Sequence, residues 1–436
     1  MTYSEPSDLA IVACPGGAVF ADDTIHHLNQ IYRRRFRQKT DFLAGRYGED
    51  GAKLVRDVNF YNDLQTSDIC VKGDVDKYRP PRFKVKTCFT WFMNGEFKTE
   101  IQECIRGKDV FIFQDVENHQ MISLNNDQNK CLLSVNDHIM CLLVTIDAVR
   151  HAGAKRISLV LPVYPYSRQH KKKGREGLTA SLLAHVYENL GVSQVITLDI
   201  HSREIENAFF SARIENLHAS YQIIRELSRI VDLTAEDNNF VVVSPDTGAV
   251  DRNKFYATGL KKPLAMIYKE RDYSIVSQNG RSSNIKSIKL LGDVSGKVAF
   301  LADDMLGTGG TLLKAMEFLK EQGATKVIAA ISLPFFTGEA VKLFDEAYEK
   351  GYFYRIIGTN AVYHEELLQK EWYINTSVCG LFAQVISRLH HNQSLSDLLD
   401  NRNVIDKLIR IGSPNSGKGE KKSSGPVQPK GQNPAE

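Results

Sequence analysis

Several features of other protein classes are missing from this sequence. Its 436 residues contain no apolar run approaching the ~20 residues of a membrane-spanning helix, so no membrane association is expected. The polar, acidic start MTYSEPSDLA resembles no signal peptide. The seven cysteines form no CxxC pair and no His-Cys metal motif, which is typical of reduced thiols in an intracellular protein. A cytoplasmic location is therefore expected.

The sequence also has little net charge. A formal net charge of +3 is small for this length, so it does not indicate nucleic-acid binding through bulk electrostatics. The contents of hydrophobic residues (42%) and charged residues (25%) are those of an ordinary globular protein. Because single hydrophobic cores rarely grow beyond roughly 250–300 residues, the length predicts two domains.

Strand-like and helical stretches alternate along most of the chain, which predicts an α/β fold with mostly parallel sheets flanked by helices. The β-prone runs form two series, residues 9–14, 109–114, 156–163 and 194–199, then 240–244, 264–268, 297–302, 327–333 and 354–358. The amphipathic helical runs span residues 137–152, 179–190, 219–231, 311–322, 339–350 and 378–391. The two series predict two domains, residues 7–216 and 217–400.

Two segments interrupt this alternation. Residues 33–86 are polar and irregular, contain proline, and are expected to form an insertion in the first domain. The basic cluster Arg33-Arg34-Arg35-Phe36-Arg37 within them is either a solvated helix face or a site for an anion or a partner. Residues 412–436 contain almost no apolar side chains, which predicts a disordered tail.

The most informative stretch is KVAFLADDMLGTGGTLL at residues 297–313. A β-prone run ends at Ala302, and two carboxylates, Asp303 and Asp304, follow it before a Gly/Thr loop and a helical run. A strand that leads into a glycine-rich turn at a helix start directs backbone N–H groups and the positive helix end toward one point, which suits a phosphate. The acids would repel phosphate, so they are expected to bind hydroxyl groups or a metal beside it.

This stretch therefore predicts a site for a phosphorylated sugar. The alternative is an ordinary strand-turn-helix connection. The loop is not a P-loop, because it lacks the Gly-Lys-Ser/Thr ending.

A second loop, residues 164–175, follows a predicted strand and carries five cations within eight residues. Such a loop can wrap a polyphosphate, with Arg168 binding two oxygens through its planar guanidinium group. The alternative is a basic loop that is only solvated.

Three further groups lie at the ends of predicted strands. His201 could bind a metal, orient a phosphate or be structural, and Asp246 could hold Mg²⁺ or cap the following helix. Lys269 and Arg271 are two positions apart on extended backbone, so both can reach one anion, although ordinary surface charge is the alternative. A Ser/Asn/Gly-rich stretch, residues 274–284, follows them and is able to move as a lid. Together these groups predict Mg²⁺-dependent phosphoryl or diphosphoryl transfer from a nucleotide to a phosphosugar.

These segments resemble the ribose-phosphate pyrophosphokinases, also called phosphoribosyl pyrophosphate (PRPP) synthetases, from about residue 92 to residue 399 and around residues 9–32. The resemblance implies two phosphoribosyltransferase-like domains, with helix 378–391 returning to the first domain. It implies the reaction of ATP with D-ribose 5-phosphate to give AMP and PRPP, with Mg²⁺ as the cofactor.

The resemblance also assigns roles to individual residues. Arg168 and Gln169 in YSRQ would contact ATP, and His201 in DIHS and Asp246 in SPDTGAVDR would bind the metal. Lys269 and Arg271 in YKERDYS would be catalytic. In LADDMLGTGGT, Asp303 and Asp304 would hold ribose hydroxyls, and Thr308, Gly309, Gly310 and Thr311 the 5-phosphate. Phe92, Asn94 and Glu96 in FMNGEF would reach the adenine bound by a neighbouring subunit of a ring-like homo-oligomer, a hexamer by resemblance.

The chain departs from the family pattern at several positions. Gly307 stands where the loop usually carries a third acid, and His170 stands where an aspartate normally follows Arg-Gln. Residues 33–86 and 115–133 are additional. Two other functions remain open, a non-catalytic regulatory subunit with the same fold and a phosphoribosyltransferase that consumes PRPP.

Overall fold

The computed structural model describes residues 8–48, 50–51, 53, 81–124, 130–172, 174–233, 239–271 and 285–411. Most of the predicted insertion, the expected lid at 274–284 and the expected disordered tail at 412–436 lie outside these residues. No helix in the described ranges is long and apolar enough to cross a membrane.

The first half of the chain builds a parallel sheet of five strands in the order β1-β4-β7-β8-β9. These strands are β1 (Leu9–Ala13), β4 (Asp109–Phe113), β7 (Arg156–Val160), β8 (Gln194–Leu198) and β9 (Arg213–Leu217). Every residue of β1, β4 and β8 is buried. Helices cover both faces of such a parallel sheet, so both faces of its inner strands are buried and their sequences are continuous apolar runs.

The helices of this half are α1 (Ala18–Tyr47), α4 (Val135–His151) and α5 (Thr179–Asn189), with the 3-10 turns η1 (Pro15–Gly17) and η3 (Arg203–Ala208). A capping box defines the start of α4, because the Ser134 hydroxyl accepts the Asp137 N–H while the Asp137 carboxylate accepts the Ser134 N–H. Two antiparallel hairpins are added, β2 (Thr87–Trp91) with β3 (Phe97–Ile101), and β5 (Met121–Ser123) with β6 (Lys130–Leu132).

The second sheet has seven strands in the order β12-β11-β10-β13-β14-β15-β16, and only the β11–β12 pair is antiparallel. The strands are β10 (Phe240–Ser244), β11 (Leu264–Arg271), β12 (Ile285–Leu291), β13 (Val298–Leu306), β14 (Lys326–Pro334), β15 (Arg355–Thr359) and β16 (Tyr373–Thr376). The helices are α6 (Ser220–Ile230), α7 (Val250–Leu260), α8 (Gly310–Glu321), α9 (Ala340–Glu349), α11 (Ser396–Leu399) and α12 (Arg402–Ile411), with the 3-10 turn η4 (Leu367–Gln369).

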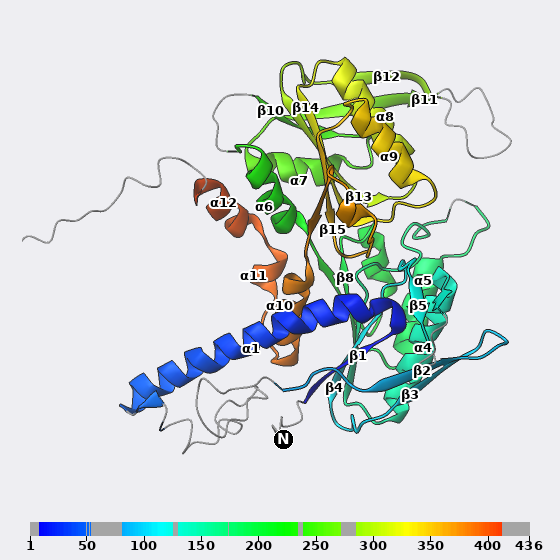
Figure 1. Ribbon diagram of the computed structural model, residues 1–436, viewed down its shortest axis with the longest axis vertical. Helices are drawn as coiled ribbons and strands as arrows, with labels where there is room; N and C mark the ends of the chain where they lie inside the picture. Colours follow the sequence, from blue (N-terminus) through cyan, green and yellow to red (C-terminus); the bar gives the residue numbers. More distant parts are fainter. Residues whose placement is uncertain are drawn as a thin grey trace, which may run out of the picture.

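Alternate residues of this sheet belong to two separate cores. Val242 packs in the cluster that contains Tyr256 of α7, whereas Val241 and Val243 pack in the cluster that contains Met316 of α8. Helices α7 and α8 therefore cover opposite faces of the second sheet (Figure 1). The observed architecture is the predicted one, with two mostly parallel sheets flanked by helices.

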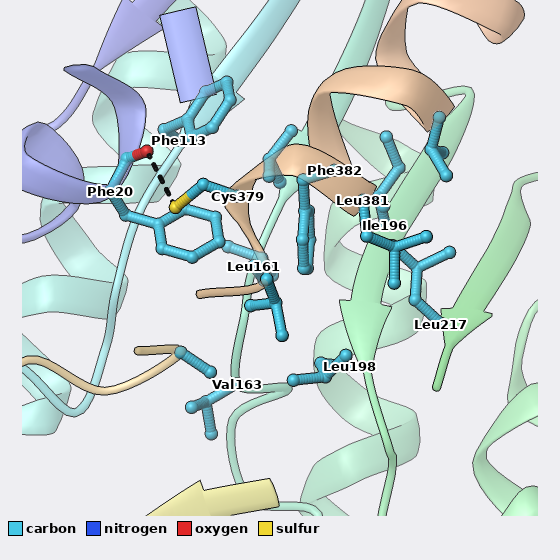
Figure 2. Packing of buried hydrophobic residues seen from close by; sticks show 14 of the residues in the cluster. Phe20, Phe113, Leu161, Val163, Ile196, Leu198, Leu217, Cys379, Leu381 and Phe382 are labelled. Atoms are coloured by element: carbon cyan, nitrogen blue, oxygen red, sulfur yellow. Dashed lines mark hydrogen bonds between the residues drawn. The ribbon is translucent and has the colours of Figure 1, made fainter. Parts of the chain in front are cut away.

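Helix α10 (Cys379–His390) comes late in the chain but lies alongside α1 (Figure 1). The rings of Phe20 and Phe382 meet edge to face with centroids 5.0 Å apart, and the Cys379 thiol donates to the Phe20 carbonyl at 3.9 Å (Figure 2). Since β9 ends at Leu217 and α6 begins at Ser220, we propose that the domains divide between these elements, with α10 returning to the first domain.

The expectation of irregular structure is wrong for residues 33–47, which continue α1. This part of the helix contains no proline, and its Arg, Lys, Gln and Leu residues favour helix. The basic cluster lies on the helix, where Phe36 is buried and Arg35 is bound to the chain near α10. The Arg35 guanidinium is 3.0 Å from His391 Nδ1 and donates to Gln393 Oε1 at 2.6 Å. Arg35 therefore has a structural role.

Candidate active site

The two acids of the sugar-phosphate motif lie within strand β13, whereas the sequence placed them after it. The ladder between β13 and β14 continues through the pairs Asp303↔Ile331 and Leu306↔Pro334. This pairing extends the strand beyond the apolar run, because backbone hydrogen bonds do not require apolar side chains. Asp303 is partly buried and Asp304 is 9% exposed, so both acids occupy an enclosed site.

The loop after β13 turns sharply into helix α8. Gly309 has φ +74°, a left-handed conformation that favours glycine, and it caps α8 without a side-chain hydrogen bond. Thr308 and Thr311 on either side of the cap are exposed. The first N–H groups of α8 therefore lie beside two exposed threonines, an arrangement that suits a phosphate.

Gly307 differs from Gly309 because its backbone is not left-handed. A methyl group at this position would meet Thr337 Oγ1 at 3.6 Å and the Arg168 guanidinium nitrogens at 3.8 Å, which are ordinary contacts. The backbone therefore does not require glycine here. An acid at this position would lie beside Arg168 of the basic loop at residues 164–175.

The structure brings His201 and Asp304 together, although they are 103 positions apart in sequence. His201 follows β8 of the first sheet and Asp304 lies on β13 of the second, and their Nδ1 and Oδ2 atoms are 2.7 Å apart. The ring of His170 meets His201 nearly edge-on with centroids 5.3 Å apart. His201 thus contacts both His170 of the basic loop at residues 164–175 and Asp304 of the second sheet.

Electrostatics distinguish the two neighbouring acids. Burial and the adjacent Asp304 raise the pKa of Asp303 to about 8. Burial also disfavours ionised Asp304, but the hydrogen bond from His201 and the charge of Arg252 outweigh it and lower the pKa of Asp304 to about 2. The pair therefore offers one carboxyl that can donate a hydrogen bond and one anionic acceptor, which suits recognition of sugar hydroxyls.

Arg168 and Gln169 line a cavity of about 770 Å³ together with Met305 and Gly307 from the end of β13. Arg168 lies over the Phe335 ring, 5.9 Å from its centroid. The Gln169 side-chain oxygen accepts a hydrogen bond from Thr179 at 2.6 Å, which fixes the side chain at the start of α5. The cavity volume falls within the range of small-molecule sites, roughly 300–1,000 Å³.

Phe92, Asn94 and Glu96 do not line this cavity. They occupy the tip of the β2–β3 hairpin, where Phe92 is 45% exposed and Met93 is fully exposed. The Asn94 side chain accepts the Glu96 N–H at 3.3 Å, which shapes the turn. The structure therefore does not bring these three residues to Arg168 of the same chain.

Lys269 and Arg271 belong to the last part of β11, which pairs antiparallel with β12. The sequence placed both residues at a strand end, and the backbone agrees. The pairing register shifts between Glu270 and Arg271, so the ladder is irregular where the strand ends.

Asp246 follows β10, and its Oδ1 accepts the N–H groups of Gly248 at 2.9 Å and Ala249 at 3.0 Å. It therefore stabilises the turn before α7 but does not cap the helix itself, because Ala249 is the N-cap residue and no side chain caps it, so the helix-cap role considered from the sequence is wrong. In the described ranges, no three His, Cys, Asp or Glu side chains converge on a point where they could hold a metal ion. His201 and Asp246 thus cannot form a complete protein cage with other described residues.

Sequence reasoning gave no role to Asp199 or Arg252. Asp199 is 6% exposed. Burial opposes its ionisation, but the His218 hydrogen bond and the Arg252 charge lower its pKa well below the ordinary value. Both residues lie in motifs already singled out, DIHS and SPDTGAVDR, and a buried acid beside His201 was the available signal.

Comparisons with known proteins cover most of the chain. Residues 82–191 match the model of the N-terminal domain of ribose phosphate pyrophosphokinase, and residues 211–367 match that of the phosphoribosyl transferase domain. Ribose-phosphate pyrophosphokinase A of Dictyostelium discoideum is 36% identical over 309 residues, covering 70% of this chain and 87% of that protein. Ribose-phosphate pyrophosphokinase 2 of Schizosaccharomyces pombe is 35% identical over 316 residues, covering 72% of this chain and 89% of that protein.

A solved structure has a similar fold. The phosphoribosylpyrophosphate synthetase from Mycobacterium smegmatis superposes with a TM-score of 0.63 at 24% identity, covering 88% of this chain and all of that chain.

Proposed function

This chain belongs to the ribose-phosphate pyrophosphokinase family. The family's reaction is the transfer of a diphosphoryl group from ATP to the 1-hydroxyl of ribose 5-phosphate, and we propose which residues of this chain bind each substrate and which stabilise the transition state. The observation that carries the proposal is a shared cavity. It is lined by Arg168 and Gln169 of residues 164–175, which we call the nucleotide loop, and by Gly307 of residues 307–311, which we call the sugar-phosphate loop. A nucleotide and a phosphosugar bound there would react side by side, which supplies proximity and orientation.

On the sugar side, Asp303 and Asp304 hold the ribose hydroxyls. The 5-phosphate binds to the N–H groups of Gly309 and Gly310 and to the hydroxyls of Thr308 and Thr311. The enclosed acids and the exposed helix start support this division. On the nucleotide side, Arg168 and Gln169 bind ATP, while Lys269 and Arg271 stabilise the charge that develops during transfer.

His201 and Asp246 would hold Mg²⁺, which would neutralise charge on the triphosphate of ATP. The Asp246 carboxylate is an oxygen donor of the kind that this ion prefers, and His201 is included on the resemblance of DIHS to the family motif. Nδ1 of His201 is used by Asp304, and an imidazole bound through one nitrogen to a carboxylate is a common arrangement for metal binding through the other. Because Mg²⁺ usually takes one or two protein ligands, with phosphate oxygens and water completing its shell, the absence of a third convergent ligand among the described residues is compatible with it.

The purified chain alone should make AMP from ATP only when ribose 5-phosphate is present. Quantifying AMP, ADP and PRPP together tests the function, because an ordinary kinase would release ADP. A chain that binds ribose 5-phosphate but makes no AMP would be a regulatory subunit. A phosphoribosyltransferase would instead consume PRPP with a base, and the match to the N-terminal pyrophosphokinase domain argues against that function.

Asp246→Asn should raise the Mg²⁺ concentration needed for half-maximal rate by about tenfold or more, because a neutral amide replaces an anionic ligand of a hard cation. The asparagine oxygen can still accept the Gly248 and Ala249 N–H groups, so the turn should survive. Asp251→Asn, which removes an exposed acid nearby on α7, is the matched control. Superimposable magnesium titrations for the Asp246 variant and the parent would contradict the assignment.

The exposed hairpin tip supports a homo-oligomer in which Phe92, Asn94 and Glu96 complete the adenine pocket of a neighbouring copy. We expect an Asn94→Ala/Glu96→Ala variant and a Lys269→Ala variant to be nearly inactive separately and to regain activity after mixing and re-equilibration. In the mixture, an intact hairpin of one copy can face an intact Lys269 of the other. An active monomer in light scattering, or no recovery after confirmed subunit exchange, would contradict the shared pocket.

A further inference from the structure

Asp199 has an unusual backbone conformation at an important position. It follows β8 directly, two residues before His201, and has φ +40° although it is not glycine. A side chain makes this left-handed conformation unfavourable, and such residues persist only where the surrounding structure holds them. The contacts of Asp199 show what holds it.

The Asp199 carboxylate contacts groups attached to both sheets. Its Oδ1 accepts from His218 Nδ1 at 2.8 Å and lies 3.5 Å from an Arg252 guanidinium nitrogen. Its Oδ2 accepts the Ala219 N–H at 3.1 Å and the Ser332 hydroxyl at 2.6 Å. His218 and Ala219 follow β9, whereas Arg252 lies on α7 and Ser332 on β14 of the second sheet. One buried acid therefore links the two sheets at their carboxyl ends.

Arg252 continues this link toward the sugar-binding acids. Its side chain is 24% exposed, and its charge acts on Asp304 and Asp303 as well as on Asp199. Asp304 in turn binds His201 at 2.7 Å. Adjacent carboxylates repel one another, so a cation beside them helps to fix their charge and position. The backbone places α7 beside these acids, because Asn253, the residue after Arg252, donates to the Ala302 carbonyl at 2.9 Å and accepts the Ala302 N–H at 2.9 Å, one residue before Asp303.

We propose that Asp199 is a positioning residue, which acts through Arg252 to hold Asp304 and Asp303 in place for ribose 5-phosphate. The inference rests on the proposed function for the identity of the sugar, but Asp199 itself contacts no substrate. Its second oxygen accepts the Ala219 N–H, a backbone contact that keeps the first oxygen facing Arg252 whether or not the Ser332 hydroxyl is present. The Asp199 charge then keeps the Arg252 guanidinium within 3.5 Å of its first oxygen, on the helix that is bound to β13 next to Asp303.

Two substitutions distinguish the Asp199 contact with Arg252 from its contact with Ser332. In Asp199→Asn, the remaining oxygen can still accept from Ala219 and Ser332, while the charge that attracts Arg252 is gone. Ser332→Ala removes only the contact to β14 and leaves the Asp199–Arg252 pair intact. If Asp199 only stabilised the contact between the two sheets, Ser332→Ala would weaken the binding of ribose 5-phosphate as much as Arg252→Gln does.

The test measures the dissociation constant of ribose 5-phosphate by calorimetry, so it does not depend on turnover. Asp199→Asn should weaken binding by about tenfold, the size typical of losing an outer partner of a binding group. In the Arg252→Gln background, the same substitution should change binding less than about twofold, because the residue through which it acts is already absent. Equal fold-changes in both backgrounds, or parent-like binding by Asp199→Asn, would overturn the proposal.

Two further outcomes are decisive. If Asp199→Asn does not fold, the variants Arg252→Gln and Ser332→Ala test the proposal instead. Binding of ribose 5-phosphate should weaken only in Arg252→Gln, and an equal loss of affinity in both variants would overturn the proposal. Failure of the proposed function would look different, because the parent chain would bind ribose 5-phosphate and still make no AMP. If the parent does not bind ribose 5-phosphate, the positioning role fails as well.

Discussion

We expect Lys269→Ala to lower kcat by about 100-fold or more, the loss typical of removing one donor that stabilises transition-state charge. The KM for ATP should change much less. Lys269 lies near the end of β11, two positions before Arg271, and the chain after Arg271 is rich in Ser, Asn and Gly. A strand end that leads into such a segment suits cations that close over the substrates only as the reaction proceeds.

Lys289→Ala is the matched control for this prediction. Lys289 lies on β12, directly opposite Tyr268 of β11, and it is exposed. The substitution Lys289→Ala removes one positive charge from the same pair of strands and should leave kcat nearly unchanged. A large rise in the KM for ATP with an unaltered kcat in Lys269→Ala would instead assign Lys269 to ground-state binding.

The strands with continuous apolar runs could be predicted from sequence because burial of the whole strand leaves a strong signal. The prediction for residues 240–244 matches β10 residue for residue. β9, with the sequence RIENL, and the short edge strand β16 lack this signal, and backbone pairing with a neighbour defines them. Helix α7 was considered only as the helix after Asp246 and was not among the predicted amphipathic runs, because it is polar and weakly patterned and its packing against β10 and β13 stabilises it.

The sequence could predict where the residues of each half of the candidate site lie along the strands, but not the contacts between the halves. His201 and Asp304 were each recognised at or near a strand end. Their pairing depends on how two sheets meet, which no local pattern encodes. Arg252 was missed because its role depends on the same packing, which places an α7 side chain beside an acid of the other sheet.

Two of the three glycines of the sugar-phosphate loop, Gly309 and Gly310, should respond very differently to the same substitution. At Gly309, an added methyl group would lie 2.3 Å from Cε2 of Phe344, and the backbone has φ +74°. The left-handed backbone and the overpacking together should destabilise the fold by about 2–5 kcal/mol. At Gly310, no atom lies within 4 Å of the added group, and alanine favours the helix that begins there.

Gly309→Ala should therefore raise the KM for ribose 5-phosphate by about tenfold or more, since losing one charge-assisted hydrogen bond from a displaced N–H group has this size. Gly310→Ala should stay within about 0.5 kcal/mol of the parent in unfolding free energy, with a KM close to the parent's. Thermal unfolding and initial rates at varied ribose 5-phosphate measure both quantities.

A second substitution separates the clash from the backbone conformation. Phe344 is fully buried among Phe336, Phe353 and Trp372, so Phe344→Leu has its own cost, but it removes the ring that meets the new methyl group. In that background Gly309→Ala should cost less than in the parent, and the remaining cost measures the left-handed backbone. If alanine at Gly309 and alanine at Gly310 prove equally harmless, then neither Phe344 nor the left-handed turn determines the shape of the phosphate loop.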